Sequence, residues 1–159
     1  MYHLKKEIIM KKLFLFLICF CFLAPSLRAQ DSDCCANFDR DAIATELEFA
    51  LQDIEGTECL DLSMQSPKLT TVSKNIAKLK NLKCLNVSYN RISTIDPDIA
   101  KLEKLECIDL SGNHYLKTLP NFLKNMSNLK VIKLEEMSLW SDAKKEQVKK
   151  DFPNITFIF

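Results

Sequence analysis

The chain has very few of the residues that flexible linkers and common catalytic sites need. Its 159 residues include two glycines, Gly56 and Gly112, and two histidines. Scarce glycine argues against flexible linkers and leaves no glycine-rich phosphate-binding or dinucleotide motif. Beyond residue 29, His114 is the only histidine, and it follows the turn residue Asn113 instead of facing a cysteine. A Cys–His nucleophile pair or a finger-type zinc site therefore lacks its parts, and we expect no enzyme, cofactor or metal.

The chain also has no marked excess of positive or negative charge. The chain has 22 Lys and Arg against 21 Asp and Glu, for a formal net charge of +1. Without residues 1–29, which hold five bases and one acid, the net charge is −3. A nearly neutral protein argues against nucleic acid or an anionic membrane surface as the main partner.

The N-terminus carries the one long apolar run. Four lysines precede the apolar residues 13–24, Pro25 follows them, and Ala29 offers a small residue for cleavage. This pattern predicts a secretory signal peptide over 1–29, because the run is shorter than the about 20 residues that span a bilayer. Translation starts at Met1 or at Met10, and the lysine-led signal is typical of bacteria. We expect a protein that is secreted, periplasmic or on the cell surface, with no stable membrane insertion after cleavage and a short tether over 30–41.

One pattern recurs along the rest of the chain. Residues 82–92 read L-x-x-L-x-V-x-x-N-x-I, and residues 105–113 repeat L-x-x-I-x-L-x-x-N. The central apolar position of each copy is filled by Leu60, Leu85, Ile108, Ile132 and, as a trace, Phe157. A period of 23 to 25 residues predicts stacked units, because one short strand cannot bury its inward residues alone.

These repeats resemble the leucine-rich repeat family in its version of about 23 residues per unit. The resemblance covers 57–139 within a domain over 42–159. It implies an α/β fold, a right-handed solenoid with a concave parallel β-sheet, and a protein or peptide ligand. Gln65 and Met137 stand where the family has asparagine, a departure that suits terminal repeats.

Within each unit, alternation assigns the residues to two sides. Leu85 and Val87 point into the core, and their neighbours point to the opposite, solvent-facing side. Asn90 and Asn113 end their strands, where we expect their amides to satisfy backbone groups of adjacent turns. The following apolar residues, spaced by threes and fours, predict a turn of helix or 3₁₀-helix on the convex side, with lysines as a solvated outer face.

Both ends of the array need a cover. For the N-terminal end, residues 42–55 predict a capping helix with Asp41 as N-cap and Gly56 as its stop. Its expected inward residues are Ile43, Leu47, Ala50 or Leu51, and Ile54. For the C-terminal end, residues 141–159 predict a helix capped by Ser141 over 142–151, followed by a strand over 155–159.

Three cysteines share one register. Cys59, Cys84 and Cys107 each precede the central apolar residue, so stacking aligns them on the concave face at about 4.8 Å intervals. Three interpretations remain: a duplicated small strand residue, a disulfide within the column or from Cys34 or Cys35 to Cys59, and metal binding with nearby aspartates. Five cysteines follow residue 29, so at least one is a free thiol or pairs between chains.

The predicted function is an exported, non-enzymatic module that binds a protein or peptide on its concave face. The alternative is a thiol- or metal-handling envelope protein that uses the cysteine column. The predicted binding residues lie on the outward strand positions and at the strand ends: Asp61, Asn86, Ser88, Tyr89, Arg91, Asp109, Ser111, Lys133 and Glu135.

Overall fold

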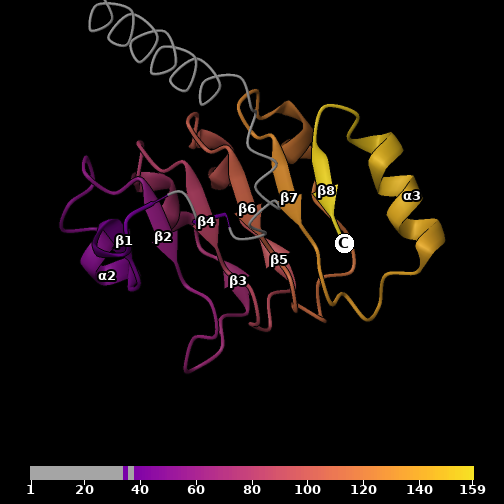
Figure 1. Ribbon diagram of the computed structural model, residues 1–159, viewed down its shortest axis with the longest axis horizontal. Coiled ribbons are helices and arrows are strands. Elements are labelled where there is room, and N and C mark those ends of the chain that lie inside the picture. The colour runs from indigo at the N-terminus through magenta and orange to yellow at the C-terminus, as the bar shows by residue number, and fades with distance from the viewer. Residues whose placement is uncertain (1–33, 36–37) are drawn as a thin grey trace, which may run out of the picture. The chain divides into compact units, whose positions relative to one another are not determined.

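A computed structural model describes residues 34–35 and 38–159, and its main feature is one parallel sheet (Figure 1). The predicted signal peptide and part of the tether lie outside the described residues. Six strands follow each other in the order β1-β2-β4-β6-β7-β8. Their bounds are β1 Ile43–Ala44, β2 Cys59–Asp61, β4 Cys84–Asn86, β6 Cys107–Asp109, β7 Val131–Lys133 and β8 Thr156–Ile158.

The register of this sheet reproduces the sequence period. Leu60 pairs with Leu85, Leu85 with Ile108, Ile108 with Ile132, and Ile132 with Phe157. The first four are buried, and Phe157 packs half-buried at the end of the row. Burying a side chain of this size contributes about 1.5 to 3 kcal/mol, so the column is the main support of the stack. The predicted α/β repeat architecture is confirmed.

The return arms run on the other side of the core. Each contains one short 3₁₀-helix: η2 Lys74–Lys78, η3 Pro97–Lys101 and η4 Asn121–Asn125. The predicted helical turns are therefore confirmed. Two further strands, β3 Thr71–Val72 and β5 Thr94–Ile95, form a small parallel sheet that the sequence pattern did not indicate.

The N-terminal cover differs from the prediction. Residues 42–55 do not form one helix: η1 Arg40–Ala42 leads into β1, and a single helical turn, α2 Leu47–Ala50, follows with Glu46 as its N-cap. Strand β1 pairs with β2, so its backbone satisfies the edge of the sheet, which a helix could not do. Ala50 is buried, Leu47 and Leu51 pack on the core, and Ile54 is exposed.

The C-terminal cover agrees with the prediction. Helix α3 spans Asp142–Asp151, and the Ser141 hydroxyl accepts a hydrogen bond from Lys144 N at its start. Val148 and Phe152 face the core, and β8 adds the last strand beside β7. Figure 1 shows α3 at the end of the stack, next to β8. From Arg40 onward, no helix combines the length and the apolar content that crossing a bilayer requires.

Candidate functional site

The two strand-end asparagines have a structural role. The Asn90 amide group donates to the carbonyl oxygens of Leu62, Val87 and Ser88, over 2.8 to 3.1 Å. Asn113 donates in the same way to Val87, Leu110 and Ser111. The side-chain oxygens of Asn90 and Asn113 accept from Leu69 N and Ile92 N. Each asparagine thus joins neighbouring turns, as the sequence predicts.

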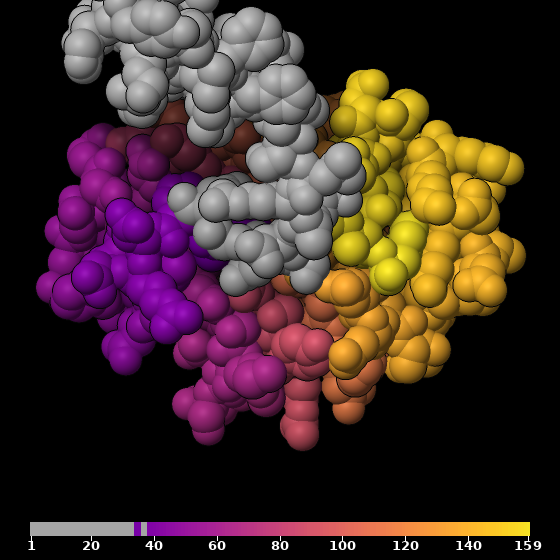
Figure 2. Space-filling model, in the orientation of Figure 1, coloured from indigo at the N-terminus to yellow at the C-terminus, as the bar shows by residue number. Residues whose placement is uncertain are grey.

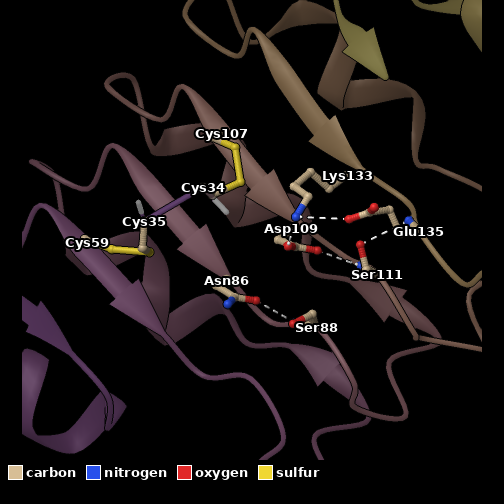
Figure 3. Close-up of a disulfide and its surroundings, with 10 residues drawn as sticks. All are labelled: Cys34, Cys35, Cys59, Asn86, Ser88, Cys107, Asp109, Ser111, Lys133 and Glu135. Atoms are coloured by element: carbon tan, nitrogen blue, oxygen red, sulfur yellow. Dashed lines mark hydrogen bonds and ion pairs between the residues drawn. A yellow bond between two sulfur atoms is a disulfide. The ribbon is translucent and has the colours of Figure 1, made fainter. Parts of the chain in front are cut away.

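The cysteine column is confirmed in register, and two of its members are in disulfides. Cys59 pairs with Cys84 across β2 and β4, and Cys84 with Cys107 across β4 and β6. Cys35 is bonded to Cys59 and Cys34 to Cys107, with Cα–Cα distances of 6.3 and 5.6 Å. Figure 3 shows these two bonds on the face of the sheet that carries the column, which we call the cysteine face.

The disulfides favour one of the three interpretations of the column. The bond from Cys35 to Cys59 was one predicted alternative, and the bond from Cys34 to Cys107 was not predicted. Cys84 lies buried between the two bonded strands and takes part in neither bond. The column therefore does not present three thiols, and the described residues contain no cluster of three or more potential metal ligands.

The polar residues of the cysteine face form turns at the strand ends. The side-chain oxygens of Asp61, Asn86 and Asp109 accept from the backbone nitrogen two residues later, over 2.8 to 3.0 Å. The Ser111 hydroxyl accepts from Glu135 N at 3.0 Å (Figure 3). These bonds lie within the sheet and satisfy the side chains where they stand.

One ion pair on this face is nearly inaccessible. Lys133 Nζ lies 2.9 Å from Asp109 Oδ2 and 3.2 Å from Glu135 Oε2 (Figure 3). The side chains of Lys133 and Asp109 are each 6% exposed. Burial alone would lower the pKa of Lys133, but hydrogen bonds and charges of both carboxylates outweigh it and raise that pKa. The pair is an internal link between β6 and β7.

The expectation that the mid-strand polar row faces solvent is therefore wrong. Five of the predicted binding residues are buried: Asn86, Ser88, Asp109, Ser111 and Lys133. Asp61 and Glu135 are half-buried, and only Tyr89 and Arg91 are exposed. Burial is tolerated there because the side chains of Asn86, Asp109, Ser111 and Lys133 are paired with each other or with backbone groups. Their role in binding stays a prediction.

A second column, which sequence analysis missed, lies just after the strands. Met64, Tyr89, Gly112 and Glu136 occupy equivalent places in four turns, and all four have positive φ, between 51° and 66°. Residues other than glycine rarely adopt this backbone conformation. The signal was available, because each of these residues directly precedes the asparagine position of its repeat.

The exposed residues gather around this second column. They line an open depression of about 490 Å³ at the ends of β2, β4 and β6. Figure 2 shows the turns after the strands projecting along the lower edge of the molecule, in magenta to orange. We call this area the strand-end surface; besides buried Asn90, it consists of Met64, Lys68, Tyr89, Arg91, Gly112, His114 and Tyr115.

Tyr89 organises the strand-end surface. Its ring lies against Gly112, and Glu136 follows one turn further on. The Glu136 carboxylate, burial and the charges of Glu135 and Asp109 raise the pKa of Tyr89. Lys68 Nζ donates to the Tyr89 carbonyl oxygen at 2.8 Å. His114 Nδ1 lies 3.2 Å from the Ser138 hydroxyl.

Comparisons with known proteins agree with this architecture. Residues 80–125 match the family model described as leucine-rich repeats in two copies. The structure is similar to that of a leucine-rich repeat protein of Leptospira interrogans, with 29% sequence identity and a TM-score of 0.59. The match covers 74% of this chain and 28% of that one. No curated protein matches the sequence significantly. Residues 80–125 therefore carry two leucine-rich repeats, and the chain has a fold similar to that of a leucine-rich repeat protein.

Proposed function

We propose that this protein is an exported, non-enzymatic module that binds another protein through the strand-end surface. Leucine-rich repeats are typical of protein-binding modules, and the structural match extends that expectation to this fold. The observation that carries the proposal is the exposure of Met64, Tyr89 and Tyr115, which are 64%, 37% and 59% exposed side by side along one depression. Tyrosine, methionine and arginine are enriched at protein interfaces, and tyrosine and arginine dominate their binding energy.

The middle of the cysteine face is a weaker candidate in this structure. Its polar side chains are buried and internally paired, so a partner would have to break those bonds before gaining new ones. Cys34 and Cys35 are also bonded onto that face. Tyr89 and Arg91, by contrast, are predicted binding residues that are exposed.

Export is supported by the sequence and by the disulfides. Residues 1–29 have the composition of a secretory signal peptide, and disulfides persist mainly in oxidising compartments outside the cytosol. Terminal sequencing of the protein recovered from outside the cytosol should give an N-terminus near Gln30. A retained Met1 or Met10 would contradict export with cleavage.

Site-directed photocrosslinking tests the binding surface. A photoreactive phenylalanine analogue at Tyr115, in the full chain and in the cells that produce it, should crosslink to one defined protein. The matched control carries the analogue at Lys101, which is 61% exposed at the end of η3. Crosslinks from Lys101 and none from Tyr115 would place the interface on the convex side and contradict the proposal.

A further inference from the structure

We infer that the strand-end surface takes an acidic, extended peptide segment of its partner, with carboxylates against Arg91 and Lys68 and an apolar side chain against Met64 and Tyr115. The inference rests on the proposed function and adds the chemistry of the partner. It starts from the charges of the depression. Its lining includes Lys68, Arg91 and His114 and contains no acidic residue.

Arg91 is the first anchor. Its backbone nitrogen donates to Leu69 O at 2.8 Å, so the start of the side chain is fixed, and the residue is exposed. Six lysines of the repeats and the C-terminal cap have a carboxylate within 4.0 Å: Lys83, Lys101, Lys130, Lys133, Lys145 and Lys149. Within the described part of the chain, no carboxylate lies within 4.0 Å of the Arg91 guanidinium. A planar guanidinium that is available in this way fits a carboxylate with two parallel hydrogen bonds.

Lys68 is the second anchor. Its ammonium group is held by the Tyr89 carbonyl oxygen at 2.8 Å, which fixes one of its three donors and leaves two for a ligand. Because the bond is made to backbone, the positive charge stays at the depression without being neutralised. A ligand carboxylate would thus meet a cation whose side chain is already ordered, so less conformational entropy is lost on binding.

The apolar part of the surface fits one apolar side chain of the peptide, next to the carboxylates of the same peptide. Met64 and Tyr115 are more than half exposed, and the ring of Tyr89 lies between their turns against Gly112. Met64, Tyr89 and Gly112 belong to three successive turns, about 4.8 Å apart, so the surface spans about 10 Å. That length matches about three residues of an extended peptide.

The turn that contains Glu135 and Glu136 determines which end of the peptide lies toward β7. Glu136 follows Gly112 in the second column and places a negative charge near the Tyr89 hydroxyl. Glu135 lies beside it and is bound to Lys133. These carboxylates repel an acidic residue, so the acidic part of the peptide lies toward β2 and β4, and a neutral or basic part lies toward β7.

Peptide binding to the purified domain with its disulfides intact tests the inference. The probe is a fluorescent peptide of sequence Gly-Glu-Glu-Leu-Phe-Gly-Ser-Gly, blocked at both ends, and its control has lysine in place of each glutamate. Fluorescence anisotropy should show affinity for the acidic peptide at least about tenfold above that for the basic one. A single-stranded oligocytidylate of equal charge should compete poorly, because cytosine has no aliphatic group for the apolar part of this surface.

Charge variants locate the effect. Arg91→Glu and Lys68→Glu should each weaken binding of the acidic peptide by about tenfold, and Arg91→Lys should cost less because it keeps the charge. The matched control is Lys101→Glu on the convex side, which should change binding by less than about twofold. Unchanged denaturant midpoints in all four variants will show that folding is intact.

Several outcomes would overturn the inference: equal binding of the two peptides, no measurable binding of the acidic one, full competition by the oligonucleotide, or equal losses from Lys101→Glu and Arg91→Glu. These failures differ from failure of the proposed function. If the analogue at Tyr115 captures a protein while the acidic peptide does not bind, the surface is an interface with a partner of other chemistry. If the peptide binds as expected while the analogue at Tyr115 captures nothing, the inferred preference for an acidic peptide is supported. The proposed protein partner is then not present in the cells that were tested.

Discussion

The ring of Tyr89 lies directly on the Cα of Gly112, one turn further along the stack. A Cβ at residue 112 would come within 2.6 Å of Tyr89 Cδ1, closer than carbon atoms approach. The carboxylate of Glu136, in the turn after Gly112, raises the pKa of the phenol on the same ring. Tyr89 therefore packs across to the neighbouring turn, and one of the two glycines of the chain makes room for it.

Gly112→Ala should destabilise the protein by about 1 to 3 kcal/mol, measured from denaturant midpoints. Two effects add: residue 112 has φ of +66°, which disfavours alanine, and the new methyl group displaces the Tyr89 ring. In a Tyr89→Ala background the displacement disappears, and the cost should fall to about 1 kcal/mol. An equal cost in both backgrounds would show that the ring contact contributes nothing.

Asn113→Ala and Asn90→Ala should each cost about 1 to 3 kcal/mol or more of unfolding free energy. Each change leaves a buried backbone N–H and several carbonyl groups without their partner. Asn125→Ala is the matched control, because Asn125 is exposed at the end of η4 and should cost less than about 0.5 kcal/mol. Equal costs at buried and exposed asparagines would contradict the proposed role.

The repeats could be predicted because their constraints are local and periodic. A strand of period 2 and a spacing of 23 to 25 residues determine β2, β4, β6 and β7, and an asparagine three residues after the last inward residue marks β4 and β6 as well. The N-terminal end could not be predicted in the same way. Residues 43–54 have helical spacing, yet Ile43 pairs with Cys59, because the open edge of β2 needs backbone partners.

The candidate site was predicted only in part, for a related reason. Alternation says which side of a strand a residue points to, and it correctly placed Asp109 and Lys133 on the cysteine face. It does not say whether that side is covered or whether neighbours pair with each other, since both depend on contacts between residues 24 positions apart. Tyr89 and Arg91 were found from their residue types, and Met64 was missed because its place directly before the asparagine position of its repeat was not used.

Lys133→Met should cost about 3 to 5 kcal/mol, because it leaves the Asp109 carboxylate buried without its cation. Adding Asp109→Asn should recover part of that loss, and a double-mutant cycle from denaturant midpoints measures the coupling. Losses that simply add would show that the two groups do not interact.

The same pair predicts a pH dependence at the alkaline end. Because the pKa of Lys133 is raised in the folded protein, its contribution to stability is complete below the unfolded lysine pKa of about 10.4. It is lost as the pH rises through the folded value. The difference in unfolding free energy between wild type and Lys133→Met should therefore be constant at neutral pH and shrink above about pH 10.4. A constant difference up to higher pH would contradict the raised pKa.

Opening either disulfide should destabilise the folded protein. Cys35→Ser releases a loop with a sequence separation of 24 and Cys34→Ser one of 73, with expected costs of about 3 and 4 kcal/mol. Denaturant midpoints with and without a reductant measure both. The reductant should affect the single variants less than wild type, and Tyr89→Ala, which touches neither bond, should respond as wild type does.

The two disulfides also determine which end of the stack opens first. In an ordinary solenoid each turn contacts only its neighbours, so both ends fray. Here the bond from Cys34 to Cys107 closes a covalent ring that passes through β1, β2, β4 and β6. A strand inside the ring gains less conformational entropy when it separates than a strand outside it, because the ring limits the conformations of the open chain. Local opening is thereby directed to β7, β8 and α3, and amide hydrogens there should exchange earlier than those of β2 and β4.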